Sequence, residues 1–240
     1  MRKTTKRIVT SLGTNSYLNG RNRLQSSLAN PNNWGPQRES GYGGDYIIFS
    51  SEAEVGAPTH WENPYAFKVY AIRDCHKRGW RQIMWVDCSV YAIGSLQPIF
   101  EITERDGYFF QEAGHMAGTW TNDKTLEYFN ITRDEAMEIP MHGNAGLMCL
   151  DFDNKKAQEF FKRWEKSMEA GMFKGSWNNT HGTESFDTRC LGHRHDMSCA
   201  SIIRHQMGLK MHPGDEFMQY GLIPDAPLKN SICLIAAGIN

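Results

Sequence analysis

The sequence predicts an α/β fold, with a mainly parallel central sheet and helices on both of its sides. Short apolar segments of strand length alternate along the chain with longer segments in which apolar residues recur at helical spacing. One strand segment, residues 82–86 (Gln-Ile-Met-Trp-Val), is apolar over almost its whole length, which is typical of a central strand buried on both faces. The order strand, helix, buried strand favours a parallel sheet.

Three strands and one well-delimited helix are expected in the first half of the chain. The strands are predicted at residues 6–12, 45–49 and 82–86. The helix has clear limits, because Asn63 is suited to cap it, Pro64 to its first turn and Gly79 to its end. Residues 13–16 and 30–44, which are rich in Gly, Asn, Ser or Pro, are expected to form loops.

The second half of the chain alternates in the same way. Thr132 and Glu135 match a capping box at the start of a short helix. Asp196 is suited to cap the last clear helix. The other expected elements are a strand at residues 145–150, a helix from Asp153 to Gly171, a polar loop at 174–194 and the end of the last helix at Gly208.

The composition fits a globular protein. Of the 240 residues, 40% are hydrophobic and 22% are charged, which argues against general disorder. Because no obvious linker divides the chain, we expect one domain over residues 1–240. No apolar run approaches the about 18 residues that a membrane helix needs, and the N-terminal residues lack the apolar stretch of a signal peptide. We therefore expect a cytoplasmic protein without membrane insertion, in the host cytoplasm if it is viral, with its oligomeric state open.

The cysteines and the charges add two expectations. The six cysteines have no CxxC spacing, so we expect reduced core thiols rather than a zinc site. Seven of the 26 Lys and Arg residues, and none of the 27 Asp and Glu residues, lie within residues 1–38. This asymmetry indicates a local anion site, for a phosphate group or a nucleic-acid backbone; the alternative is a solvated basic arm.

Two short segments hold the candidate functional residues. In residues 85–89 (Trp-Val-Asp-Cys-Ser), Asp87 directly follows the buried strand, at the sheet edge where open α/β folds bind ligands. A carboxylate there is suited to bind a divalent cation; the alternative is an Asp that only accepts backbone hydrogen bonds in a turn. Residues 192–196 (Gly-His-Arg-His-Asp) bring together imidazole, guanidinium and carboxylate groups, which bind metals, phosphates or protons unless they serve only as a cap and surface residues.

The order of four segments resembles small nucleotide-sugar-dependent glycosyltransferases of the GT-A fold, which is Rossmann-like. The segments are residues 63–68 (Asn-Pro-Tyr-Ala-Phe-Lys), 85–89, 144–147 (Asn-Ala-Gly-Leu) and 193–196 (His-Arg-His-Asp). The resemblance covers residues 6–212 in element order. It implies an Asp-x-Asp motif at a strand end that holds Mn²⁺ or Mg²⁺ on the donor diphosphate, and a later carboxylate close to the sugar.

Carried over by position, the resemblance implies a role for each of several residues. Asp87 matches the first acid of the motif, and Ser89 stands where the second would be, with a hydroxyl that is a weaker cation ligand. His195 or His212 would complete the metal coordination. Asp196 matches the late carboxylate and, with Asp87, would be catalytic. The other donor-binding residues implied are Thr10, Ser11, Gly13, Arg21, Arg23, Lys68 and Asn144.

The implied function is transfer of a hexosyl or pentosyl group from a UDP- or GDP-sugar to a hydroxyl group. The acceptor would be a glycan or a hydroxymethylated DNA base, and retention and inversion are both open. A cation and Arg groups would stabilise the leaving diphosphate. The alternative is a nucleic-acid-binding protein that uses the basic N-terminal segment and stacks bases on Trp34 and Tyr42, although the net charge of −1 argues against a dedicated binder.

Overall fold

The computed structural model describes residues 6–29, 42–142, 146–221, 229 and 231–238. Its central sheet has five strands in the order β2-β1-β3-β8-β5. These strands are β1 (Arg7–Leu12), β2 (Tyr46–Phe49), β3 (Gln82–Val86), β5 (Tyr108–Phe110) and β8 (Leu147–Asp151). β1 pairs in parallel with β2 and β3, whereas β8 runs antiparallel to both β3 and β5. Four strands thus point the same way, so the sheet is mainly parallel as predicted, with one reversed strand.

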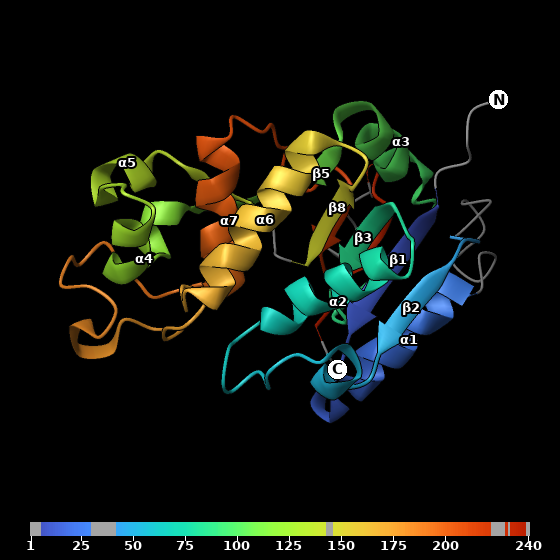
Figure 1. Cartoon of the computed structure of the whole chain (residues 1–240), viewed down its shortest axis with the longest axis horizontal. Helices are drawn as coiled ribbons and strands as arrows, with labels where there is room; N and C mark the ends of the chain where they lie inside the picture. Colours follow the sequence, from blue (N-terminus) through green and yellow to red (C-terminus); the bar gives the residue numbers. More distant parts are fainter. Residues whose placement is uncertain (1–5, 30–41, 143–145, 222–228, 230, 239–240) are drawn as a thin grey trace.

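Helices cover both faces of this sheet (Figure 1). α2 (Ala66–Lys77) and α6 (Lys155–Glu169) pack on one face, while α1 (Leu18–Ala29) and α3 (Gln97–Asp106) pack on the other. Alternate strand residues serve the two layers: Trp85 joins the core under α2 and α6, and Met84 joins the core under α1 and α3. The continuous apolar pattern of β3 is therefore explained by burial on both faces.

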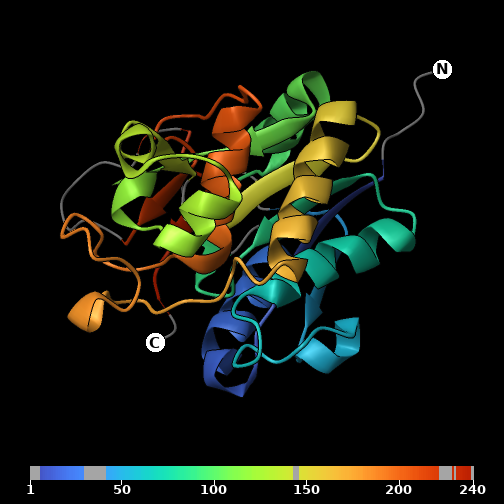
Figure 2. The ribbon, with the colours of Figure 1, turned by 60° about the vertical axis from the view of Figure 1, so that its left-hand side comes forward.

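α7 (His195–Gln206) packs against α6. The remaining elements form two groups, one beside α7 and one that contacts α1 through the strand at residues 90–92. Figures 1 and 2 both place α4 and α5 on the side of α7 that lies away from α2. The further elements are α4 (Asp123–Tyr128), α5 (Arg133–Met137), the two-stranded sheet of β6 (Glu112–Met116) and β7 (Pro140–His142), and the three-stranded sheet of β4 (Val90–Ala92), β10 (Leu234–Ala236) and β9 (Met218–Tyr220).

Helix ends were predicted better than helix starts. Gly79, Gly171 and Gly208 each follow a helix with a positive φ (95°, 78° and 62°), as predicted for left-handed C-terminal residues. The capping box of Thr132 and Glu135 is also present. The predicted cap Asn63 is wrong, because its amide donates to the Met168 carbonyl and Tyr65 precedes α2 instead.

Two further differences concern α1 and α7. The predicted cap Asp196 is wrong, since Asp196 lies inside the first turn of α7 and is buried there. α1 was not predicted, because Gly20, Asn22 and Ser26 interrupt its apolar pattern and few of its residues are buried. The six cysteines are free and buried, which agrees with reduced core thiols. Of the described helices, none combines the length and the apolar character needed to cross a membrane.

Candidate functional site

The candidate site lies where the carboxyl ends of β1 and β3 meet the first turns of α2 and α7. Because β1 and β3 are parallel neighbours, both end at the same edge of the sheet. Asp87 directly follows β3, Lys68 lies in the first turn of α2 and Asp196 in the first turn of α7. Three segments far apart in the sequence therefore place one ammonium and two carboxylates together.

Lys68 lies between the two carboxylates. Its Nζ is 3.1 Å from Asp87 Oδ1 and 3.2 Å from Asp196 Oδ2. The exposed fractions of the three side chains are 1% for Lys68, 3% for Asp196 and 31% for Asp87, so only Asp87 reaches solvent substantially. Trp85 donates its indole N–H to Asp87 Oδ1 over 2.7 Å, and the Lys68 ammonium lies 5.0 Å from the centre of the Tyr65 ring.

This cluster has an excess of negative charge, which affects the pKa of its members. Burial, with a further contribution from the Asp87 charge, raises the pKa of Asp196 to about 6 although Lys68 opposes the shift. Burial opposes the charge of Lys68, but the two carboxylates outweigh it and raise the pKa of the ammonium. Lys68 Nζ and Asp196 Oδ2 form an ion pair over 3.2 Å between two buried groups. Asp196 is thus a buried carboxyl group whose pKa lies above its ordinary value.

Two adjoining cavities meet at this cluster. Both are lined by Tyr65, Asp87 and Ser89. The cavity on the α7 side has a volume of about 240 Å³ and is lined further by Lys68, His115, Trp177, Arg194, Asp196 and Tyr220; because it has more charged side chains, it is called the polar cavity. The cavity on the β1 side has a volume of about 440 Å³ and is lined further by Leu12, Thr14, Tyr17, Glu52, His60 and Phe67; it has fewer charged side chains and is called the aromatic cavity. Asp87 therefore separates a polar compartment from an aromatic one.

Arg194 brings a second positive charge to the polar cavity. Its guanidinium carbon lies 3.6 Å from the centre of the Trp120 ring and 4.1 Å from that of Trp177. Nη1 donates to the Trp177 carbonyl over 2.9 Å. Stacking between two indole rings fixes the plane of the guanidinium and holds a cation close to Asp196 in the chain and in the cavity.

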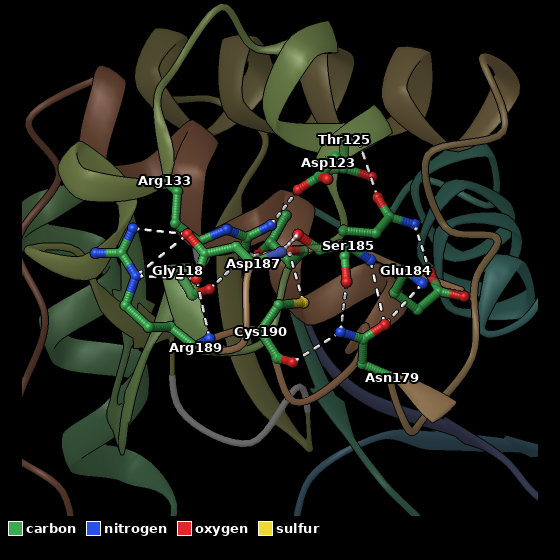
Figure 3. Close-up of polar contacts among 12 residues, drawn as sticks. Gly118, Asp123, Thr125, Arg133, Asn179, Glu184, Ser185, Asp187, Arg189 and Cys190 are labelled. Atoms are coloured by element: carbon green, nitrogen blue, oxygen red, sulfur yellow. Dashed lines mark hydrogen bonds and ion pairs between the residues drawn. The ribbon is translucent and has the colours of Figure 1, made fainter. Parts of the chain in front are cut away.

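The segment that carries Trp177 and Arg194 is fixed by a network of polar contacts (Figure 3). The Asn179 amide donates to the Ser185 and Cys190 carbonyls and accepts from the Glu184 and Ser185 amides. Arg189 pairs with Asp187 of the same segment and donates over 2.7 Å to Asp134 of α5. Although residues 174–194 contain little regular structure, as predicted, their shape is therefore well determined.

Several predicted donor-binding residues support the site from behind instead of lining it. Thr10 and Ser11 are buried within β1, and Ser11 Oγ lies 3.1 Å from Cys88 Sγ. Gly13 permits this approach, since a Cβ there would lie 2.6 Å from Cys88 Sγ. Burial raises the pKa of Cys88 to about 11, which keeps it a protonated thiol rather than a nucleophile.

The two predicted phosphate-binding arginines are bonded to the main chain. Arg21 donates to the Gly13 carbonyl over 3.2 Å, and Arg23 donates to the carbonyls of Ser89 and Gly238. These bonds hold the loops that border the aromatic cavity. Asn144 lies outside the described residues.

The predicted metal ligands are not brought together. Ser89 lines both cavities beside Asp87, but His195 is buried behind Tyr65, donates from Nδ1 to the Phe173 carbonyl over 2.8 Å, and has its pKa lowered to about 4 by burial. His212 stacks on Phe109 and lies 3.0 Å from Glu216. Within the described ranges, no three His, Cys, Asp or Glu side chains are close enough to hold a metal ion. These residues do not fit the predicted coordination, and a cation requirement stays a prediction.

The nucleic-acid alternative gains little from the structure. Tyr42 is buried, stacks on Phe100 and donates to the Asp45 carbonyl, so it does not present a face for a base. Arg7 is bound to Gln82, Gln97 and Glu104. Trp34 lies outside the described residues. The basic residues of β1 and α1 thus stabilise the fold through internal contacts.

Several lining residues were not singled out individually from the sequence, among them Tyr65, Trp177 and Tyr220, whereas the Arg194 guanidinium belongs to the predicted cluster at residues 192–196. Tyr65 and Arg194 belong to segments that were singled out, and each stands next to or near a predicted residue. Trp177 lies in a polar loop, where a large aromatic residue indicates a binding role. Tyr220, which is 61% exposed, carries no local signal, because only the pairing of β9 with β10 brings it to the cavity.

Comparison with known proteins shows a similar fold. No protein-family model and no curated protein sequence matches the chain. The structure is similar to that of a bifunctional glycosyltransferase, WbbM, in its apo form, with a TM-score of 0.52 and 11% sequence identity. The similarity covers 98% of this chain and 46% of the other, so this chain spans about half the length of that protein. At this identity the likeness establishes a shared α/β fold, as found in a glycosyltransferase.

Proposed function

We propose that the protein is a glycosyltransferase of the GT-A class that transfers a sugar from a nucleotide-sugar donor to a hydroxyl group. The observation that carries the proposal is the pair of cavities that meet at Asp87, at the carboxyl ends of two parallel strands. Ligands of open α/β sheets bind at this edge. The likeness to the fold of a glycosyltransferase supports the proposal.

The aromatic cavity suits the nucleoside of the donor. Tyr17, His60, Tyr65 and Phe67 surround it with planar side chains, on which a base and a ribose can pack. Leu12 and Thr14 contribute the end of β1 and the backbone that follows it. A nucleoside in this cavity would direct its phosphates toward Asp87 and the polar compartment.

The polar cavity suits the diphosphate, the transferred sugar and the acceptor. Arg194 and Lys68 supply positive charge where the leaving diphosphate becomes more negative, and fixed charges in a partly buried cavity stabilise such a transition state strongly. Asp196 would accept the proton of the acceptor hydroxyl. The oxygen of that hydroxyl would bond to the anomeric carbon as the bond between the sugar and the diphosphate breaks. This route inverts the anomeric configuration.

Trp177 and Tyr220 favour a glycan as the acceptor. Both side chains line the polar cavity, and 48% and 61% of their surfaces are exposed, so rings are presented at the cavity to an incoming sugar. We therefore propose a glycan acceptor, with a hydroxymethylated DNA base as the second acceptor class to be tested.

The test is nucleotide release from a panel of UDP- and GDP-sugars, with mass spectrometry of glycan and hydroxymethylated DNA acceptors. We expect one nucleotide class to be released, and Asp196→Asn to release it at least about 100-fold more slowly. Asp153→Asn is the matched control, because Asp153 is exposed at the start of α6 and its side chain only approaches Arg81. Absence of both nucleotide binding and release across the panel contradicts the proposal.

A further inference from the structure

We propose that the Lys68 ammonium takes the place of a divalent cation between the carboxylates of Asp87 and Asp196, so that the site works without bound Mn²⁺ or Mg²⁺. The proposal rests on the proposed function for its catalytic consequence, but its structural part concerns these three side chains alone. The position of Asp87 at the end of a strand had predicted a bound divalent cation instead.

Lys68 occupies the space that a divalent cation between Asp87 and Asp196 would need. A divalent cation that used Asp87 and Asp196 together would have to lie within about 2.0–2.6 Å of an oxygen of each. That space is taken, since Lys68 Nζ already lies 3.1 Å and 3.2 Å from oxygens of the two groups. A cation added there would be in direct contact with an ammonium of the same sign.

Both carboxylate oxygens of Asp87 already have donors from the protein. Oδ1 accepts from the Trp85 indole over 2.7 Å in addition to its ion pair with Lys68. Oδ2 also lies within 3.5 Å of Lys68 Nζ. Both oxygens are thus oriented by donors from the protein, and Ser89 next to it offers a hydroxyl rather than the second carboxylate that a cation prefers.

Lys68 is buried and closely surrounded by aromatic rings. Its side chain is 1% exposed, and its ammonium lies 5.0 Å from the Tyr65 ring centre and 5.8 Å from that of Trp85. It lies in the first turn of α2. The ammonium is therefore a fixed part of the site, and with Arg194 it supplies the positive charge that a leaving diphosphate requires.

The test measures Mn²⁺ binding directly, by electron paramagnetic resonance of the free ion, with and without UDP or GDP. We expect the wild type to bind no more Mn²⁺ than Lys77→Ala, a control at an exposed lysine of the same helix. Lys68→Ala should gain a Mn²⁺ site, because it leaves two neighbouring carboxylates without their cation, and the double variant Lys68→Ala, Asp87→Asn should lose that site. Circular dichroism establishes which variants fold.

The wild type decides the matter even where Lys68→Ala does not fold. One Mn²⁺ bound per chain and lost in Asp87→Asn overturns the proposal, with or without nucleotide. Nucleotide release that stops with EDTA and returns with Mn²⁺ overturns it as well, while leaving the proposed glycosyl transfer intact. Release that is unchanged by EDTA, and about 100-fold slower in Lys68→Ala, supports it. If no sugar nucleotide is turned over, the proposed function fails, and the Mn²⁺ titration still decides the role of Lys68.

Discussion

Trp85 donates its indole N–H to Oδ1 of Asp87 over 2.7 Å. The two residues lie two positions apart at the end of β3, where alternation places their side chains on the same face of the sheet. The strand that forms the core under α2 and α6 thereby also orients the carboxylate at the centre of the site. A residue of the core thus holds the carboxylate that lines both cavities.

Replacing Trp85 by Phe should weaken this coupling. The variant keeps an aromatic ring but leaves Asp87 without the indole donor, so we expect a loss of about 1–2 kcal/mol in unfolding free energy and about 10-fold in turnover. Urea unfolding and nucleotide release on one preparation measure both. Trp80→Phe is the control, since Trp80 only packs against the edge of the same core. Equal effects of the two substitutions on turnover would argue against the orienting role.

Asp87→Asn should lower turnover by about two to three orders of magnitude, because the charge that faces both cavities is removed while the shape is kept. Lys68 would retain only Asp196 as a charged partner, so the unfolding free energy should fall by about 1–3 kcal/mol. Thermal melting and specific activity are to be measured together, with Asp153→Asn alongside. A variant that melts early yet keeps its specific activity would exclude Asp87 from the site.

The activity should rise with pH as Asp196 loses its proton. Burial raises the pKa of Asp196 to about 6, and below that pH the carboxyl group is protonated and cannot act as a base. The pH dependence of kcat/KM should therefore show an ascending limb with a midpoint near pH 6, which is absent from the residual activity of Asp196→Asn. A flat profile between pH 5 and pH 7 would contradict the assignment of Asp196 as the base, given the pKa of about 6.

The contribution of Asp196 to the free energy of unfolding should fall as the pH rises, whereas the activity should rise. Because the pKa of Asp196 is higher in the folded protein than its ordinary value of 3.8, its stabilising contribution is complete below pH 3.8 and is lost as the pH rises through about 6. The difference in unfolding free energy between wild type and Asp196→Asn should thus shift against the wild type across this range. Urea unfolding at several pH values measures it, and a difference that is independent of pH would contradict the shift.

Arg194→Lys should raise the KM for the donor about 10-fold and change kcat less. Lysine keeps the charge but lacks the flat guanidinium that lies between the rings of Trp120 and Trp177 and offers paired N–H donors to a phosphate. Steady-state kinetics with the donor measure the effect. Arg78→Lys, which changes an exposed arginine at the end of α2, provides the control.

The parts of the molecule that sequence could predict are those that depend on neighbours along the chain. The strand at 82–86, the acid that follows it and the glycines after three helices are local features, and each was confirmed. The direction of β8 was not predictable, because an apolar run reports burial and carries no information about which way the strand runs.

The chemistry of Asp196 illustrates what local reasoning leaves out. Near the start of a helix, an Asp is most simply interpreted as a cap. Its actual partner, Lys68, belongs to a different helix, and the two charges come together because α2 and α7 both pack against α6. Conversely, Arg21 and Arg23 are residues of the type that binds phosphate, but they donate to backbone carbonyl groups. No sequence pattern identifies these carbonyl groups as partners.

A residue with left-handed backbone geometry stands immediately before α2 and at the first position of α7, namely Tyr65 with φ 60° and His195 with φ 51°. For residues with a side chain this conformation costs about 1–2 kcal/mol each, which glycine would avoid. Glycine would also remove two rings whose centres lie 5.2 Å apart and enclose the ammonium side of the cluster. The backbone strain at positions 65 and 195 is therefore the cost of keeping the paired rings of Tyr65 and His195 beside the ion cluster.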